Sequence, residues 1–120
     1  MNVVVSARGQ NLDAQIDPRF GRAPYFLLVD MDTMECQAVP NPAGMQATQG
    51  AGVQAASLVA SYQPAAVLTG NCGPNAFKVL KTAGIQVVIG AMGKVKDAVQ
   101  GFQAGLLKPA NSPNVASPWK

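Results

Sequence analysis

The chain of 120 residues contains no histidine. This absence removes the Ser-His-Asp triad, the cysteine–histidine proteases, histidine-ligated zinc and the usual general base of neutral-pH catalysis. Charged residues are also few, and the nine Lys and Arg exceed the six Asp and Glu by only three. A positive charge so mild and dispersed argues against a nucleic-acid partner, but it suits a small anionic ligand.

Cysteines and long apolar runs are scarce as well. The two cysteines, Cys36 and Cys72, form neither a C-x-x-C pair nor a zinc-site spacing, which favours a reducing, cytoplasmic setting. No apolar run approaches the ~20 residues that span a bilayer, and no signal peptide precedes Val3. We therefore expect no membrane partner.

What the chain does contain is enough apolar sequence for one compact domain. Apolar residues make up 48% of the chain, and at this length roughly two-thirds of the unfolded surface can be buried. We assign residues 1–107 to a single α/β domain. Residues 108–120 hold three prolines and little periodicity, so they are predicted to form an extended C-terminal tail.

Apolar periodicity predicts five strands and three helices in the order β-β-β-α-β-α-β-α. The predicted strands are Met1–Ala7, Pro24–Asp30, Glu35–Val39, Ala65–Thr69 and Gln86–Ile89. The predicted helices are Gly52–Tyr62, Pro74–Ala83 and Val95–Leu106. A hairpin at Asp32-Thr33 followed by two right-handed crossovers gives a three-layer α/β/α sandwich. Its mixed sheet has the order 3-2-1-4-5, with strand 2 antiparallel.

In this topology the first, third, fourth and fifth strands share one direction, so the loops that leave them open on one edge of the sheet. Ligands bind at this edge in α/β folds. Two of the loops, 8–23 and 40–50, are long, and we expect them to hold few apolar anchors and to be mobile without ligand.

The fourth predicted strand runs into a glycine turn and then a helix start. Gly70 and Gly73 bracket Asn71 and Cys72, and Pro74 suits the first position of a helix. Free N–H groups and the positive end of the helix dipole would lie beside the thiol. We therefore expect an anion there. For Cys72 the sequence leaves two alternatives, a thiolate ligand whose pKa is lowered by the helix start or a small apolar residue that fills the turn.

Two segments, Asp17–Phe26 (DPRFGRAPYF) and Leu68–Phe77 (LTGNCGPNAF), together resemble the dinitrogenase iron–molybdenum cofactor biosynthesis family. The resemblance covers about residues 1–107, and it implies a ribonuclease-H-like motif. It also implies that the protein is not an enzyme but binds and carries an anionic molybdenum-containing metal–sulfur cluster. The cluster would be of the Fe–Mo type or the Mo–Cu type, the latter held by free-standing members in sulfate reducers. A donor or acceptor protein of unknown identity is implied too.

One departure from the family pattern concerns the ligands. Many members have His-Phe-Gly where this chain has Arg19-Phe20-Gly21, so histidine ligation of a metal is not carried over. Arginine offers charge and forked donors in place of a lone pair.

The candidate cofactor-binding residues lie on the four loops of the predicted edge. They are Arg19, Phe20, Gly21, Arg22, Met45, Thr69, Gly70, Asn71, Cys72, Gly73, Pro74, Asn75 and Met92. Cys72 is the candidate metal ligand, and the alternative is a small apolar residue that fills the turn. The methionines offer either thioether contacts or adaptable packing. The asparagines either donate to the cluster or form caps and turns.

Two other functions compete with cluster carriage. A ribonuclease-H-like nuclease needs clustered carboxylates that typically begin on the first strand, whereas Val3-Val4-Val5-Ser6 has none and the six acids are scattered. A phosphate- or nucleotide-binding regulatory module is the stronger alternative, because a glycine turn before a helix also cradles phosphate. The sequence nevertheless lacks both G-x-G-x-x-G and G-x-x-x-x-G-K-[ST].

Overall fold

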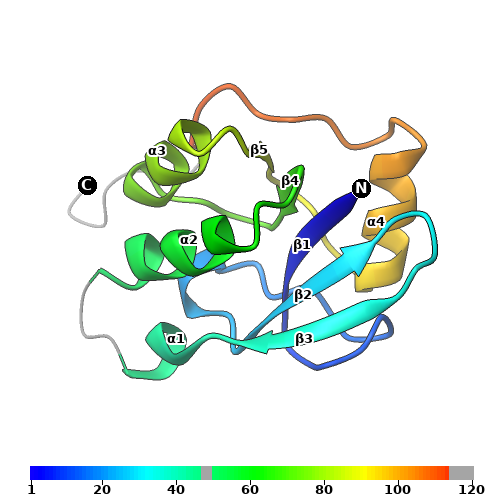
Figure 1. Cartoon of the computed structure of the whole chain (residues 1–120), viewed down its shortest axis with the longest axis horizontal. Coiled ribbons are helices and arrows are strands. Elements are labelled where there is room, and N and C mark those ends of the chain that lie inside the picture. Colours follow the sequence, from blue (N-terminus) through cyan, green and yellow to red (C-terminus); the bar gives the residue numbers. More distant parts are fainter. Residues whose placement is uncertain (47–49, 114–120) are drawn as a thin grey trace.

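A computed structural model of the chain describes residues 1–46 and 50–113, without the side chains of residues 45 and 46. Five strands form one sheet of order β3-β2-β1-β4-β5, with helices on both faces (Figure 1). The strands are β1 (Asn2–Ala7), β2 (Tyr25–Asp30), β3 (Cys36–Pro40), β4 (Ala66–Leu68) and β5 (Gln86–Val88). The helices are α1 (Pro42–Gln46), α2 (Ala51–Ser61), α3 (Pro74–Thr82), α4 (Val95–Gln103) and the 3-10 turn η1 (Phe20–Arg22).

The pairing of the strands confirms the predicted topology. β2 is antiparallel to both β1 and β3, whereas β1, β4 and β5 run parallel to one another. Strands β1, β3, β4 and β5 therefore point the same way, and the loops that follow them leave from the same edge of the sheet.

Alternating side chains of the sheet build two apolar clusters, one on each face. Val3 and Val5 of β1 belong to the cluster beneath α4, whereas Val4 belongs to the cluster beneath α2 and α3 (Figure 1). This is the expected consequence of the two-residue period of a strand buried on both faces. The result is the predicted three-layer sandwich.

The first long loop and the described residues of the second, 40–46 and 50, contain short helical segments, whereas residues 47–49 lie outside the described part of the chain. The mobility of both loops without ligand stays a prediction. Within 8–23, Ile16 and Phe20 are buried apolar anchors, and η1 adds a 3-10 turn. The expectation that this loop holds few apolar anchors is therefore wrong. In the second loop the chain forms α1, which begins at Pro42, and proline is favoured in the first turn of a helix.

The described part of the C-terminal tail packs against the domain. The Ala110 N–H donates to the Val87 carbonyl of β5 at 2.7 Å, so the segment after α4 crosses the β5 edge toward α3 (Figure 1). Residues 114–120 of the predicted tail lie outside the described part of the chain. No helix among the described residues is both long and apolar enough to cross a membrane.

Candidate functional site

Four loops meet at the edge where β1, β3, β4 and β5 end. Backbone bridges join Arg19 to Asn71 and Gln15 to Lys94, which link the loop after β1 to those after β4 and β5. The Gly90 N–H donates to the Gly70 carbonyl at 2.9 Å, so the loops after β4 and β5 touch as well. The loop after β3 joins them through the Asn41 side chain, which donates to the Gly21 and Ala23 carbonyls of the loop after β1. The predicted convergence of these loops is confirmed.

The closest approach is between Pro18 and Gly70. The Asn71 N–H donates to the Pro18 carbonyl at 2.7 Å, and the Phe20 N–H donates to the Asn71 carbonyl at 3.4 Å. A Cβ added to Gly70 would lie only 2.7 Å from Pro18 Cα, so only glycine fits here without a shift. The two sequence segments that resemble the family are therefore joined directly.

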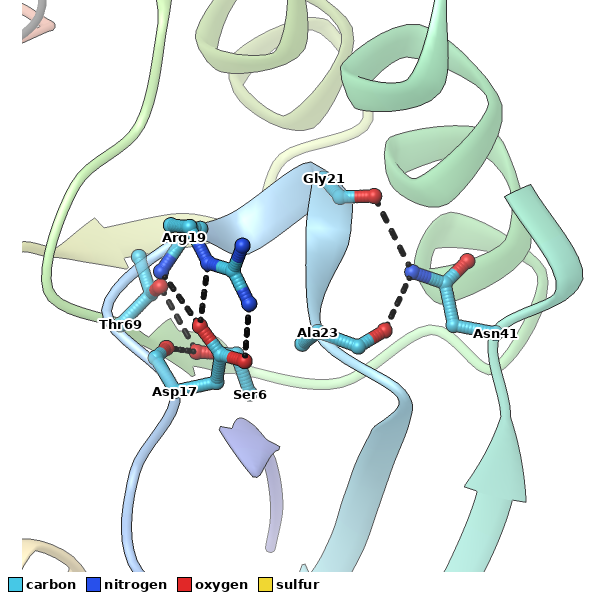
Figure 2. A network of polar contacts seen from close by, with 7 residues as sticks. All are labelled: Ser6, Asp17, Arg19, Gly21, Ala23, Asn41 and Thr69. Atoms are coloured by element: carbon cyan, nitrogen blue, oxygen red, sulfur yellow. Dashed lines mark hydrogen bonds and ion pairs between the residues drawn. The ribbon is translucent and has the colours of Figure 1, made fainter. Parts of the chain in front are cut away.

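Arg19 is fixed by a buried carboxylate. Its Nε and Nη2 donate to the two oxygens of Asp17 at 3.2 and 3.1 Å, and its backbone N–H donates to Asp17 Oδ1 at 2.9 Å (Figure 2). The Asp17 side chain is 2% exposed and that of Arg19 is 65% exposed. Burial alone would raise the pKa of Asp17, but the bonds from Arg19 and the charges of Arg19 and Arg8 hold that pKa below its usual value.

Beneath this ion pair lies a buried hydroxyl pair. Ser6 Oγ donates to the Asp17 carbonyl at 2.7 Å and lies 2.7 Å from Thr69 Oγ1, which links β1 to the end of β4 (Figure 2). Thr69 is fully buried, so its hydroxyl makes its hydrogen bond inside the fold and does not reach the surface of the site.

Two helix starts open beside η1. Gly52 in the first turn of α2 packs so closely on η1 that a Cβ on Gly21 would lie 2.8 Å from Gly52 N. A Cβ on Gly52 would in turn lie 3.4 Å from Ala76 Cβ, in the first turn of α3. No side chain caps either start among the described residues. The positive ends of both helix dipoles therefore lie next to η1.

At the start of α4, by contrast, backbone N–H groups already have hydrogen-bond partners in the loop after β1. The Val95 and Lys96 N–H groups donate to the carbonyls of Ala14 and Leu12 at 2.9 and 3.0 Å, and Lys96 Nζ pairs with Asp13 at 3.2 Å. This helix start is therefore closed by the loop after β1. The starts of α2 and α3 have no side-chain cap among the described residues, so they are the candidate anion sites of this edge.

The structure agrees with the second alternative for Cys72, in which the residue fills the turn. Cys72 is 1% exposed and belongs to the apolar cluster beneath α2 and α3. Its Sγ lies 3.7 Å from the Gly73 carbonyl oxygen, and burial raises the pKa of the thiol to about 11. The alternative in which the start of α3 lowers this pKa is wrong, because desolvation of the thiolate outweighs the dipole.

The other predicted residues divide by exposure. Phe20 is buried, with its ring centroid 5.1 Å from that of Phe26, so it anchors the turn. The residues of the set that reach solvent are Arg19, Arg22, Asn71, Pro74, Asn75 and Met92. Met92 is 80% exposed. Met45 lies in α1, but its side chain is outside the described part of the structure.

Two site residues were missed by the sequence analysis. Asp17 stands in the first motif as Asp-x-Arg, a spacing that allows the bidentate pair. Asn41 lies between Pro40 and Pro42, and its Nδ2 donates to the carbonyls of Gly21 and Ala23 at 3.3 and 2.8 Å (Figure 2). Only the proline spacing marks this position in the sequence, and it does not predict those partners.

The donor set of this edge favours an anion over a bare metal ion. Within residues 1–46 and 50–113, no three His, Cys, Asp or Glu side chains are grouped so as to hold a metal. The cations of the edge are Arg8, Arg19, Arg22, Lys94 and Lys96, and its three acids are Asp13 and Asp17, each paired with a cation, and Asp97 in the first turn of α4. Positive charge and helix N–H groups together bind anions.

Comparisons with known proteins agree with this fold. The family model described as dinitrogenase iron-molybdenum cofactor matches residues 1–105. The apo orange protein of Desulfovibrio gigas is 42% identical and superposes with a TM-score of 0.91, over 95% of this chain and 96% of that one. A putative NifB protein from Thermotoga is 28% identical with a TM-score of 0.75, over 90% and 91%. An uncharacterised protein of Methanocaldococcus jannaschii is 29% identical over 97 residues, which are 78% of this chain and 81% of the relative.

Proposed function

The chain belongs to the dinitrogenase iron-molybdenum cofactor family, and on that premise we propose that it binds and carries an anionic molybdenum-containing metal–sulfur cluster. The cluster is of the Mo–Cu or the Fe–Mo type, and the protein holds it without catalysing a reaction. It receives the cluster from a donor protein or passes it to an acceptor protein, neither of which is identified.

The observation that carries this proposal is that the starts of α2 and α3, which have no side-chain cap among the described residues, converge beside η1, the turn that contains Arg22. Gly52 of α2 lies between Gly21 of η1 and Ala76 of α3, so both dipoles act on the space next to Arg22. A helix N-terminus and an arginine each favour a multiply charged anion, and N–H groups donate to sulfide as they do to oxygen.

The lack of protein ligands also favours a cluster that carries its own sulfides. An ordinary iron–sulfur centre takes four protein ligands, usually cysteines. The whole chain has two cysteines, and of these only Cys72 lies at the edge. A molybdenum–sulfide cluster supplies sulfur from within, so the protein needs mainly to match its charge and shape.

The remaining candidate residues have distinct roles in the proposal. Asn71 and Asn75 flank the start of α3 and donate to cluster sulfides, and Met92 offers a soft thioether from the loop after β5. Cys72 is the one candidate metal ligand of the set. For it to ligate a metal, the Gly70–Gly73 turn must open and the thiol must lose its proton.

Protein purified from its native source tests the proposal most directly. We expect visible sulfide-to-metal charge-transfer bands and molybdenum by elemental analysis, together with iron or copper. A colourless, molybdenum-free protein that bound a nucleotide tightly would contradict the proposal. That result would favour the phosphate- or nucleotide-binding module, since the same helix starts can cradle phosphate.

A further inference from the structure

The turn that carries Arg22 has little to hold it in place by itself. η1 is a single 3-10 turn without a side-chain cap, in which the Arg22 N–H donates to the Arg19 carbonyl at 3.2 Å. One isolated turn is marginal, because a single hydrogen bond does not offset the entropy of fixing its residues. The position of Arg22 is therefore set by contacts from outside the turn.

Asn41 supplies such contacts from the loop after β3. Its Nδ2 faces the carbonyl oxygens of Gly21 and Ala23, at 3.3 and 2.8 Å, on either side of Arg22 (Figure 2). Its backbone N–H donates to the Pro24 carbonyl at 3.0 Å. One residue thus holds three of the four carbonyls from Gly21 to Pro24, and its own side chain is 3% exposed.

The next turn of the chain supports the same segment. The Gly44 N–H donates to the Asn41 carbonyl at 3.1 Å, which starts α1. A Cβ on Gly44 would lie 2.8 Å from the Ala23 carbonyl oxygen, so α1 packs directly on the backbone after η1. Asn41 therefore lies between η1, which contains Arg22, and α1, which packs against the backbone after η1.

Packing alone does not account for an asparagine at this position. Among the described residues, the buried Oδ1 of Asn41 accepts no hydrogen bond, and Figure 2 shows it on the side of the amide away from the two carbonyls. A buried acceptor without a donor costs free energy, and leucine would fill the same shape without that cost. Leucine cannot supply the two donors that face the turn.

We infer that Asn41 is a positioning residue of the anion site, whose amide clamps the Gly21 and Ala23 carbonyls and so keeps Arg22 beside the starts of α2 and α3. The inference rests on the proposed function, because it assigns Asn41 a role in holding the same ligand. Asn41 does not touch the ligand and acts through Arg22.

Asn41→Leu tests this inference, with tetrathiomolybdate as the probe anion. We expect the variant to bind the probe about 10-fold or more weakly in a visible-absorbance titration at low salt, which is the usual effect of losing an outer-shell partner. Its melting temperature should fall by only a few degrees, because removal of the unpartnered Oδ1 partly offsets the loss of the two bonds to the Gly21 and Ala23 carbonyls. Amide hydrogen exchange should become faster at Gly21, Arg22 and Ala23. Asn111→Ala, at an exposed position of the tail, is the control that leaves binding unchanged.

The possible outcomes separate the inference from the proposed function. If Asn41→Leu fails to fold, Asn41→Asp keeps the side-chain shape, lacks the donors when ionised and should show the same loss. Binding by Asn41→Leu equal to that of the unaltered chain, with unchanged exchange at Gly21–Ala23, would overturn the inference and leave the proposed function standing. Failure of the unaltered chain to bind the probe would overturn the proposed function, and the inference with it.

Discussion

The guanidinium of Arg19 pairs with the carboxylate of Asp17, which is almost completely buried. Asp17 accepts three hydrogen bonds from Arg19, two from the side chain and one from the backbone. The charge of Arg19 is therefore largely balanced by Asp17, and the pair fixes the direction of the remaining guanidinium donors. The other cations of the edge are Arg8, Arg22, Lys94 and Lys96, beside the acids Asp13 and Asp97.

The first prediction concerns this pair. Arg19→Ala should lower the melting temperature by roughly 4–8 °C at pH 7, because Asp17 then keeps only the backbone N–H of residue 19 and its buried Oδ2 loses its donor. Asp17→Asn added to Arg19→Ala should restore part of that loss, since a neutral amide costs less to bury than a carboxylate.

The pH dependence of this effect follows from the lowered pKa of Asp17. A carboxyl whose folded-state pKa is lowered adds stability above its unfolded pKa, and that stability is lost as the pH falls through the folded value. The difference in melting temperature between Arg19→Ala and the unaltered chain should therefore be full above about pH 5 and shrink at more acid pH. A difference that stayed constant down to pH 2 would contradict the assignment of the pair.

A second prediction at the residue scale concerns the Cys72 thiol. With a pKa of about 11, it should hold roughly 100-fold less thiolate at pH 8 than a thiol with the ordinary pKa of 9.0. Iodoacetamide should therefore modify Cys72 very slowly in the Cys36→Ser variant, and at the ordinary rate after denaturation. Mass spectrometry over time measures both rates. Rapid modification of the folded variant would mean that the α3 start does lower this pKa.

At the scale of elements, close backbone contact holds the loops together. Gly70 lies on Pro18, and Gly21 lies on Gly52, so the loops after β1 and β4 and the first turn of α2 approach one another through their backbones. Backbones that approach this closely leave their N–H groups and helix starts on a common surface. The proposed anion site thus depends on the placement of the glycines as much as on charge.

Gly70→Ala tests this arrangement. Its Cβ would lie 2.7 Å from Pro18 Cα, so we expect a loss of about 1–3 kcal/mol in the free energy of unfolding. Gly73→Ala is the matched control, because no heavy atom lies within 4 Å of its added Cβ and its φ of −75° suits any residue. It should change stability by less than about 1 kcal/mol. Urea unfolding of both variants measures the difference, and equal stabilities would argue against the Pro18–Gly70 contact.

Strand order could be predicted from the sequence because each strand has a local signature. The β-branched run Val3–Val5, the hairpin at Asp32-Thr33 and the two later crossovers leave few topologies that obey the handedness rule. Once the strand directions were fixed, Arg19 and Asn71 had to meet at one edge.

The parts that could not be predicted depend on contacts between distant residues. Nothing local distinguishes Asn41 from an ordinary turn asparagine, since its partners lie 18 and 20 residues away. The burial of Cys72 was open for the same reason. A glycine turn before a helix exposes or buries its thiol according to how the neighbouring loops pack, and here Pro18 and Phe20 bring the loop after β1 onto the turn.

At the scale of the whole molecule, charge is divided between the two ends of the sheet. The edge with the four loops carries five cations (Arg8, Arg19, Arg22, Lys94 and Lys96) and three acids (Asp13, Asp17 and Asp97), whereas the hairpin between β2 and β3 at the opposite end carries Asp30, Asp32 and Glu35, of which Asp32 pairs with the N-terminal amine. A dipolar distribution of this kind orients an approaching anion toward the positive end and makes the encounter depend on ionic strength.

The central claim is that charge and helix N–H groups hold the cluster, and that covalent ligation by Cys72 is not required. Arg8→Gln plus Arg22→Gln tests it against Cys72→Ala, with Lys78→Gln plus Lys108→Gln as a control that removes the same charge from exposed positions elsewhere. The measurement is molybdenum retained per chain after desalting, at ~0.02 M and ~0.5 M salt, which bracket the range over which exposed charges become screened.

We expect the arginine double variant to bind roughly 3- to 30-fold more weakly at low salt, because each exposed ion contact contributes modestly. Cys72→Ala and the lysine control should retain the metal, and retention by the unaltered chain should fall at high salt. Complete loss of molybdenum from Cys72→Ala, with salt-independent retention by the arginine double variant, would show thiolate ligation and contradict the electrostatic account.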